Sequence, residues 1–323
     1  MVTSSAAAAE TWLVGDVGAT NARFGLVSPS RELLHTRTLP VADHPTIAEA
    51  ITTFLGERGE LPMPRQGAIA IASAVTGDHV AMTNHPWSFS ISSLKAQLGL
   101  DRLEVINDFT ALALALPHLK PEHRLQVGGG APALGAALGV LGPGSGLGVS
   151  GLIPAGNGWI PLAGEGGHAT MAAATERESA VFDRMRRHFD HVSAERVLSG
   201  PGLVNLYNAL AALDGVPSRG YTAAQITDPA IGAADSLCAE TTAMFCAMLG
   251  TMAGNLALTL GARGGIYIGG GIVPRLGQRF TQSPFRARFD AKGRFSHYLA
   301  AIPTCVVTHP LPAFLGCAAV LAG

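Results

Sequence analysis

The chain has 323 residues, of which 48% are hydrophobic and 14% charged, and its formal net charge is −1. This composition is too apolar for a disordered chain and too nearly neutral for a nucleic-acid-binding or polybasic membrane surface. Its length favours about two domains. The four cysteines form no CxxC pair and no zinc-spaced cluster with histidine, which predicts buried free thiols and a reducing compartment such as the cytoplasm.

The termini and the apolar segments give no sign of a membrane protein. The N-terminal stretch MVTSSAAAAET lacks the basic start and the apolar run of a secretory signal peptide, so none is expected. The most apolar window, residues 131–153, mixes aliphatic residues with many glycines and two prolines. It is therefore expected to form turns and strands and not a spanning helix. Neither a membrane nor a nucleic-acid partner is predicted.

The first part of the chain is predicted to open on a β-hairpin with a glycine-rich turn. Strands and helices then alternate. The expected elements are strand–turn–strand over 12–27, a strand over 33–41, a helix within 44–58, strands over 67–72 and 103–106, and a helix over 109–116 that Pro117 ends.

The second part is predicted to repeat this opening. Strands over 138–140 and 147–153 flank another glycine-rich turn, and a third strand follows over 158–161. Further on we expect a helix over 176–189, a long apolar helix over 233–262 that is broken or loosened near Gly250 and Gly254, strands over 265–268 and 305–308, and a closing helix over 312–321. The pattern predicts an α/β protein with mixed sheets and a domain boundary near 117–121. It leaves open whether the last helix packs on the first domain.

Two glycine-rich turns, at residues 15–21 and 144–148, head the two parts of the chain. Glycine lets backbone N–H groups approach an anion closely, so the pair suggests a nucleotide phosphate chain. In the first turn Asp16 can orient Mg²⁺, directly or through water, and Thr20 and Asn21 add donors. The alternative is that both are ordinary hairpin turns. A third cluster, residues 269–271, suits a ribose or a flat ring, or is a plain turn after a strand.

Acidic residues follow predicted strands and loops. Asn107 and Asp108 come directly after LEVI, where a ligand binds in an α/β sheet or where a helix is capped, and position alone does not decide between the two. A carboxylate there can accept a hydroxyl proton during phosphoryl transfer. Glu165 and His168 in GEGGH, and Glu195 in AERVLSGPG, are candidates for binding a polyol. Each is a weak signal alone, since most glutamates are surface charges and most isolated histidines are structural.

Taken together, these stretches resemble the bacterial ATP-dependent glucokinases of the hexokinase/actin-like ATPase superfamily. The matching segments run in family order along almost the whole chain and are LVGDVGATNARFGL, TGDHVAMTNHPWSFS, EVINDFTALALALP, GPGSGLGVSGL, GEGGH, HVSAERVLSGPGLVNLY and GGGIVPRL. The resemblance implies a two-domain actin-like ATPase (ribonuclease H-like) α/β fold with a ligand cleft between the lobes. The small domain would be 1–118 completed by 301–323, and the large domain 119–300. The implied protein is a cytoplasmic homodimer that converts D-glucose and ATP, with Mg²⁺, to glucose 6-phosphate for glycolysis.

The resemblance also implies roles for individual residues. The proton acceptor falls on Asp108. The sugar-binding positions are Asn84, Asn107, Asp108, Glu165, His168 and Glu195. The nucleotide positions are Gly15, Asp16, Val17, Gly18, Ala19, Thr20 and Asn21 in the first loop, Gly144, Ser145, Gly146 and Gly148 in the second, and Gly269, Gly270 and Gly271 on the adenosine side. Asp16 would hold Mg²⁺ through water.

The chain departs from the family pattern at two loops. Ala19 stands where a glycine is more usual, which is tolerable if its φ is negative. Pro143 removes one N–H donor beside the second loop. The zinc-binding cysteine motif of the related ROK sugar kinases is absent, which argues against that branch. The remaining alternatives are a hexokinase of broader specificity, use of another phosphoryl donor, and a non-catalytic sugar- or nucleotide-binding regulator on the same fold.

Overall fold

The computed structural model describes residues 10–83 and 85–323. Contacts divide the chain into two compact units, Met1–Leu119 with His309–Gly323, and Lys120–Thr308. The family resemblance implied that residues 301–308 belong with the C-terminal helix in the first domain. They cluster instead with the second unit, because their strand pairs within the second sheet. The candidate sugar residue Asn84 lies outside the described residues. So does most of the N-terminal stretch MVTSSAAAAET, in which no signal peptide is expected.

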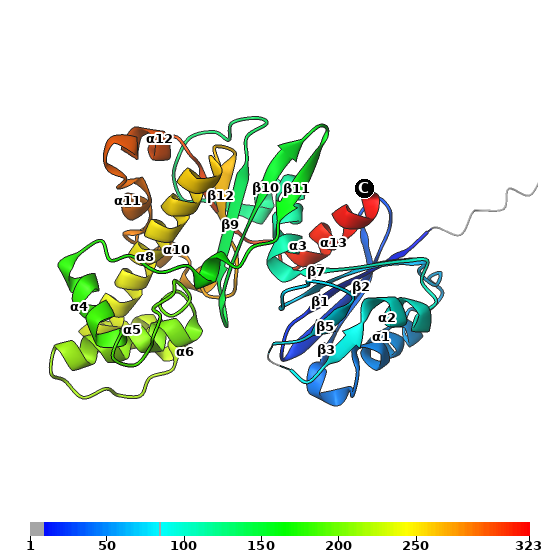
Figure 1. Cartoon of the computed structure of the whole chain (residues 1–323), viewed down its shortest axis with the longest axis horizontal. Coiled ribbons are helices and arrows are strands. Elements are labelled where there is room, and N and C mark those ends of the chain that lie inside the picture. Colours follow the sequence, from blue (N-terminus) through cyan, green and yellow to red (C-terminus); the bar gives the residue numbers. More distant parts are fainter. Residues whose placement is uncertain (1–9, 84) are drawn as a thin grey trace, which may run out of the picture. The chain divides into compact units, whose positions relative to one another are not determined.

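The first unit is built on a five-stranded mixed sheet in the order β3-β2-β1-β4-β7 (Figure 1). The hairpin strands β1, β2 and β3 are antiparallel, and β4 and β7 run parallel to β1. The strands are β1 (Trp12–Val17), β2 (Asn21–Val27), β3 (Leu33–Pro40), β4 (Gln66–Ile71) and β7 (Arg102–Asn107), and a separate small hairpin pairs β5 (His79–Ala81) with β6 (Ser88–Ser90).

Helices cover both faces of this sheet (Figure 1). Helices α1 (Ile47–Gly56) and α2 (Ile91–Gln97) pack on one face, and α3 (Asp108–Ala115) and α13 (Pro312–Ala322) pack on the other. Residues of β4 alternate accordingly: Ile69 and Ile71 meet α1, whereas the small Ala68 and Ala70 meet α13. The closing helix thus belongs to the first unit, as the family resemblance implied, although the residue pattern alone left this open.

The second unit repeats this topology in a six-stranded sheet of order β11-β10-β9-β12-β13-β8. Strands β9, β10 and β11 are antiparallel, β12 and β13 run parallel to β9, and β8 adds an antiparallel edge. The bounds are β8 (Arg124–Gln126), β9 (Leu138–Pro143), β10 (Leu147–Ala155), β11 (Gly158–Leu162), β12 (Gly265–Ile268) and β13 (Thr304–Val307). The predicted repeat of architecture and the mixed sheets are confirmed, and the window 131–153 does form turn and strand.

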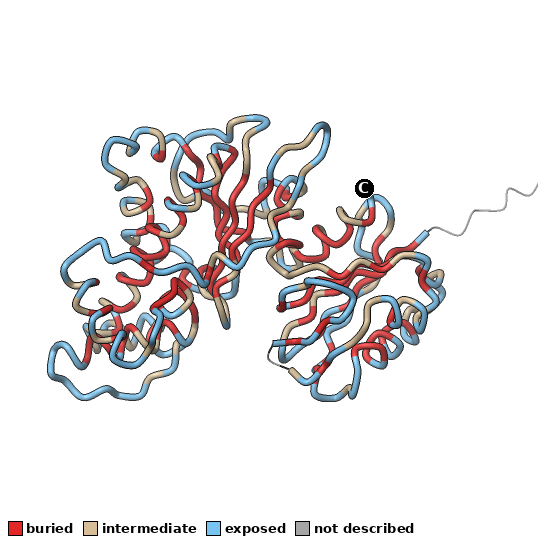
Figure 2. Tube along the Cα trace, viewed as in Figure 1, coloured by how far each residue is buried: buried red, intermediate tan, exposed pale blue. Residues whose placement is uncertain are grey.

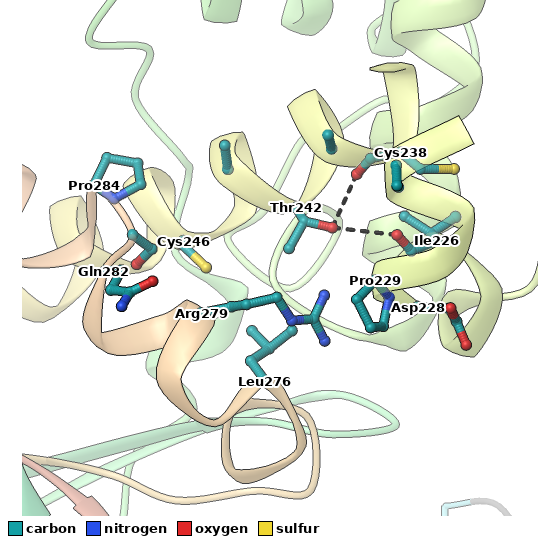
Figure 3. A pocket seen from close by; sticks show the side chains of 15 residues that line it. Ile226, Asp228, Pro229, Cys238, Thr242, Cys246, Leu276, Arg279, Gln282 and Pro284 are labelled. Carbon is teal, nitrogen blue, oxygen red and sulfur yellow. Dashed lines mark hydrogen bonds between the residues drawn. The ribbon is translucent and has the colours of Figure 1, made fainter. Parts of the chain in front are cut away.

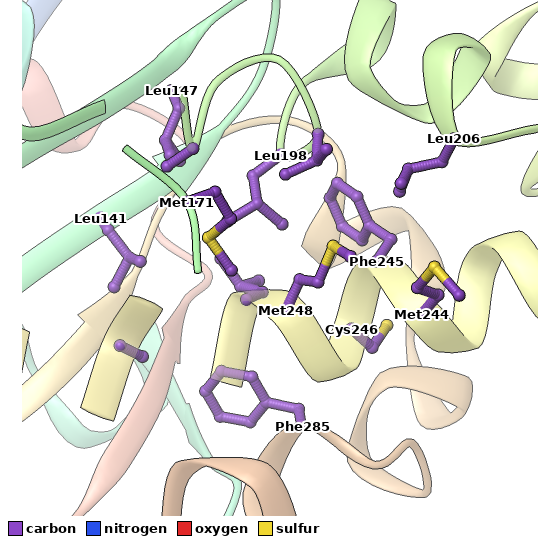
Figure 4. Close-up of a cluster of buried hydrophobic side chains, with 14 of the residues drawn as sticks. Leu141, Leu147, Met171, Leu198, Leu206, Met244, Phe245, Cys246, Met248 and Phe285 are labelled. Carbon is purple, nitrogen blue, oxygen red and sulfur yellow. The ribbon is translucent and has the colours of Figure 1, made fainter. Parts of the chain in front are cut away.

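The helices of the second unit enclose a large apolar core, seen from close by in Figure 4 and as the buried red segments of Figure 2. They are α4 (Glu176–Met185), α5 (Gly200–Leu213), α6 (Ala223–Ile226), α7 (Pro229–Ala234), α8 (Ser236–Leu260), α9 (Val273–Leu276), α10 (Gln278–Thr281), α11 (Phe285–Asp290) and α12 (Ser296–Ala300). Helix α5 was not anticipated, because its start in SGPG reads as a turn. Ser199 caps it by accepting a hydrogen bond from the N–H of Gly202.

The expected break in the long helix is wrong: α8 runs unbroken through Gly250 and Gly254. The two glycines serve packing, because a Cβ at Gly250 would collide with the carbonyl of Phe285, and one at Gly254 would lie 2.9 Å from the carbonyl oxygen of Phe289. Helix α11 can therefore approach closely. Among the described residues α8 is the one helix long and apolar enough to span a membrane, but 61% of its apolar window is buried, as in a core helix.

All four cysteines are buried and free of disulfides, as predicted. Burial raises the pKa of the Cys246 thiol to about 11 and that of Cys317 to about 12. At neutral pH these thiols are protonated and unreactive, so they act as small core residues.

Candidate active site

The strand register of the first unit brings its candidate residues to one edge of the sheet. Val17 at the end of β1 lies beside Ile71, and Ile71 lies beside Asn107 at the end of β7. The first glycine turn and Asp108 therefore follow strands that end at the same edge of the sheet, one on each side of β4. The carboxyl ends of parallel strands are where α/β sheets bind ligands.

The first glycine turn is a tight connection between β1 and β2. The N–H of Gly18 donates to the carbonyl of Asn21 at 3.0 Å, so this donor closes the turn. Gly18 is half-buried, and Ala19, Thr20 and Asn21 are exposed. Among the described residues only Arg31 is a non-glycine with positive φ, so Ala19 adopts an ordinary backbone conformation and its methyl group causes no strain.

Asp16 lies on β1 directly before this turn and pairs across the hairpin with Arg23. The Arg23 Nη1 and Asp16 Oδ2 atoms are 3.1 Å apart. Burial raises the pKa of the Asp16 carboxyl above its ordinary value, and the charge of Arg23 partly opposes that rise. Sequence reasoning missed Arg23, although hairpin register would have found it, since residues equidistant from a turn face each other.

Asn107 caps helix α3, one of the two roles that the sequence left open for Asn107 and Asp108. Its Oδ1 accepts hydrogen bonds from the N–H groups of Phe109 at 2.9 Å and Thr110 at 3.2 Å. Its amide donates to the carbonyl of Ser73 at 3.3 Å. Because Asn107 is the cap, Asp108 is the first helical residue, half-buried, with Oδ1 2.9 Å from the N–H of Phe109. A negative charge is stabilised at this end of a helix.

Ser73, which sequence analysis did not identify, connects Asn107 with Thr83. Its carbonyl receives the Asn107 amide, and its buried hydroxyl accepts from the N–H of Thr83 at 2.9 Å. Thr83 is thus held next to the residue that caps α3.

In the second unit the glycine turn at 144–148 lies beside the cluster at 269–271. Leu141 on β9 pairs with Ile268 on β12, and the N–H of Gly269 donates to the carbonyl of Leu141 at 2.9 Å. A Cβ at Gly142 would lie 2.6 Å from the carbonyl carbon of Gly269. Gly270 has φ of +75°, and a Cβ there would collide with the carbonyl oxygen of Pro143. These glycines therefore let the segment at the second glycine turn and the cluster at 269–271 lie in direct backbone contact.

The loop GEGGH packs against the same hairpin. A Cβ at Gly167 would collide with the carbonyl oxygen of Leu147, which explains the glycine. Glu165 and His168 are largely exposed, and their Oε2 and Nε2 atoms are 4.0 Å apart. The N–H of Glu195 donates to the carbonyl of Gly167 at 2.9 Å. The structure thus brings together Glu165, His168, Glu195 and the second glycine turn.

A pocket of about 420 Å³ opens between helices α6 to α8 and the segment after the third glycine cluster (Figure 3). Its apolar wall includes Ile226, Cys246 and Leu276, and its polar groups include Thr242 and Arg279. Leu276 ends α9, which begins two residues after Gly271. The pocket is therefore near the glycines in the chain and has the apolar lining and few polar groups of a small-molecule site.

Among residues 10–83 and 85–323 there is no cluster of three or more His, Cys, Asp or Glu side chains suited to a metal ion. A single carboxylate such as Asp16 still suits Mg²⁺, which keeps several waters and shares phosphate oxygens of a substrate. The donor set thus fits a magnesium ion that arrives with a nucleotide.

Each unit thus has a mixed sheet that carries an antiparallel hairpin with a glycine-rich turn, and candidate polar side chains lie near that turn. A solved glucokinase from an Antarctic psychrotroph has this fold, with a TM-score of 0.88 and 36% identity over 97% of this chain and 98% of that one. The family model for glucokinase matches residues 13–323. The curated glucokinase of Paramagnetospirillum magneticum is 54% identical over 95% of this chain and 96% of that protein. The chain belongs to the glucokinase family.

A more distant likeness extends to the ROK family. A ROK family glucokinase from Streptomyces griseus, solved with glucose and AMPPNP, has a TM-score of 0.65 over 96% of this chain and 98% of that one. At 19% identity this likeness concerns the fold alone.

Proposed function

We propose that the chain transfers the γ-phosphoryl group of ATP to O6 of D-glucose and releases ADP and glucose 6-phosphate. The observation that carries the proposal is the glucokinase family match over residues 13–323, which includes every candidate site residue. The strand ends that gather these residues in each unit support it. The finer parts of the proposal are an actin-like ATPase architecture in which both units act on the same substrates, a homodimer, and location in the reducing cytoplasm, which suits four unpaired thiols.

Asp108 accepts the proton of the sugar O6 hydroxyl as that oxygen attacks the γ-phosphorus atom. This role needs an aimed carboxylate, and the cap made by Asn107 fixes the first turn of α3 that carries it. Bound Mg²⁺ neutralises the charge of the phosphates. Asp16 would hold that ion or its waters, and Arg23 orients the Asp16 carboxylate from across the hairpin.

The glycine turns at 15–21 and 144–148 bind the phosphates, and the pocket behind Gly271 receives the adenine ring. Short contacts connect the second glycine turn to the helices that line the pocket. The N–H of Gly200 donates to the carbonyl of Gly144 at 2.8 Å, and Gly200 lies beside Ala223, the first residue of α6. Ile226 and Leu276 offer apolar faces to a flat ring, and Thr242 and Arg279 offer polar edges.

Filling this pocket tests the adenine assignment. We expect Ala243→Phe, which places a ring at the exposed Ala243 on the pocket wall, to raise the KM for ATP about tenfold or more, because a lost apolar ring contact is worth about 1–3 kcal/mol. The KM for glucose should stay within about twofold. The matched control is Leu258→Phe, at an exposed position of the same helix away from the pocket. An unchanged KM for ATP in Ala243→Phe would move the adenine elsewhere.

Glu165, His168 and Glu195 bind hydroxyls of the sugar in this proposal. We expect Glu165→Gln to raise the KM for glucose about tenfold or more with a smaller change in kcat, because a hydrogen bond to a charged group is worth about 1.5–3 kcal/mol. Steady-state kinetics with glucose varied at saturating ATP measure this. Glu176→Gln, in the first turn of α4, is the control. Equal KM values for both variants would remove Glu165 from the sugar site.

The decisive experiment is coupled ADP release by the purified chain with Mg²⁺ and ATP, with and without glucose, fructose and mannose. Strong stimulation by glucose alone supports a glucokinase in the narrow sense. Stimulation by several sugars keeps the chemistry but broadens it to a hexokinase. If no sugar stimulates ADP release, and ADP and polyphosphate also fail as phosphoryl donors, a non-catalytic binding protein is favoured.

A further inference from the structure

The second glycine turn is held at both of its sides by one short segment, residues 193–200. On one side the N–H of Gly200 donates to the carbonyl of Gly144 at 2.8 Å. On the other side the N–H of Leu147 donates to Oε2 of Glu195 at 2.9 Å. A segment that the sequence presents as a sugar-binding motif therefore also fixes the ends of the phosphate turn.

Glu195 is itself fixed by its backbone. Its N–H donates to Gly167 in the GEGGH loop at 2.9 Å, and its carbonyl accepts the hydroxyl of Ser199 at 2.8 Å. Ser199 is buried and caps α5. The Glu195 side chain thus extends from a rigid point to the N–H of Leu147, a buried residue that begins β10 opposite Pro143.

The Glu195 carboxylate lies directly against the backbone of the turn at Gly146. A Cβ at Gly146 would lie 2.5 Å from Oε2 of Glu195. At Gly144, on the other side of the same turn, a Cβ would meet open space. Contact with Glu195 therefore explains why residue 146 is a glycine, whereas no such contact accounts for Gly144.

We propose that Glu195 is a positioning residue for the phosphate turn as well as a ligand of the sugar, and so couples the two subsites. This inference rests on the proposed function, which makes Glu195 a sugar ligand. A carboxylate has two oxygens and about four acceptor positions, so Oε2 can hold Leu147 while the other oxygen accepts from a sugar hydroxyl. Sugar bound to Glu195 then restricts the turn that receives the phosphates. Because binding linkage is reciprocal, a bound nucleotide tightens the sugar subsite by the same factor.

The first test measures glucose binding by calorimetry in the absence of nucleotide. Gly146→Ala displaces the Glu195 carboxylate, and we expect the Kd for glucose to rise about tenfold. Gly158→Ala, at the start of β11 after the turn from β10, should leave that Kd within about twofold, because its Cβ would lie 3.8 Å from the nearest atom, an ordinary van der Waals contact. Equal Kd values for the two variants would overturn the proposal. If the unaltered protein binds no glucose, the proposed function fails with it, whereas glucose binding that both variants retain defeats the coupling alone.

The second test uses AMPPNP with Mg²⁺ in the absence of glucose. The carbonyl of Gln still accepts from the N–H of Leu147, whereas an alanine side chain leaves that donor without Oε2. We expect Glu195→Ala to raise the Kd for AMPPNP about fivefold or more and Glu195→Gln to leave it within about twofold, while both variants weaken glucose binding. Unchanged AMPPNP binding in Glu195→Ala would show that the residue serves the sugar only. Thermal unfolding of each variant controls for loss of fold.

Discussion

Asp108→Asn is expected to lower kcat by at least about 100-fold, because a general base contributes about 10²–10⁴-fold to rate. The amide keeps the size and the helical position of the carboxylate, so the first turn of α3 and its Asn107 cap should stay in place. The Kd for glucose, measured directly by calorimetry, should change far less than kcat. A fall in kcat without an equal rise in Kd indicates a group that acts in the transition state.

The control for this variant is Asp101→Asn. Asp101 immediately precedes β7, at the end of the strand opposite Asn107, and forms an exposed ion pair with Arg65 at 2.6 Å. Its loss should leave kcat within about twofold, since exposed ion pairs contribute little. If Asp108→Asn kept more than about a tenth of the unaltered kcat, the assignment of the base would be wrong.

Gly270→Ala is expected to lower the free energy of unfolding by about 1–3 kcal/mol and to raise the KM for ATP. Two physical causes act at this position. The φ of +75° disfavours any side chain, and a Cβ would collide with the carbonyl of Pro143 beside the second phosphate turn. To relieve the collision, β9 and the segment after β12 must separate, which moves the phosphate turn.

Gly271→Ala is the matched control, since a Cβ at the next residue meets nothing and its φ is not positive. Urea unfolding of the two variants makes the comparison, because Gly271 is itself a nucleotide position and so is a control for packing alone. Similar unfolding free energies for both would mean that the close approach of the two glycine segments is not required for stability.

The candidate site was predictable where it follows from short stretches of chain. Asp108 follows a buried strand, and glycine turns join strands. Few structural or functional interpretations fit such local patterns. The resemblance to a family then placed roles on them. The partners of these residues were not predictable, because Ser73 reaches Asn107 across 34 residues and Glu195 reaches Leu147 across 48. Such pairs form only once separate strands and loops have packed together.

The two hairpins, the strands after them and the position of the proposed catalytic carboxylate could be predicted from the sequence, because period-two apolar patterns and glycine turns act over a few residues. Only the folded structure explains why α8 stays helical through Gly250 and Gly254 and how the last helix, which the residue pattern alone did not place, packs on the first sheet. Helix α13 joins the first unit because Gly316 lets it lie against the carbonyl of Ala111 on α3. The same glycine pattern that suggests a break in an isolated helix permits close packing in a folded one, and only the neighbouring backbone distinguishes the two.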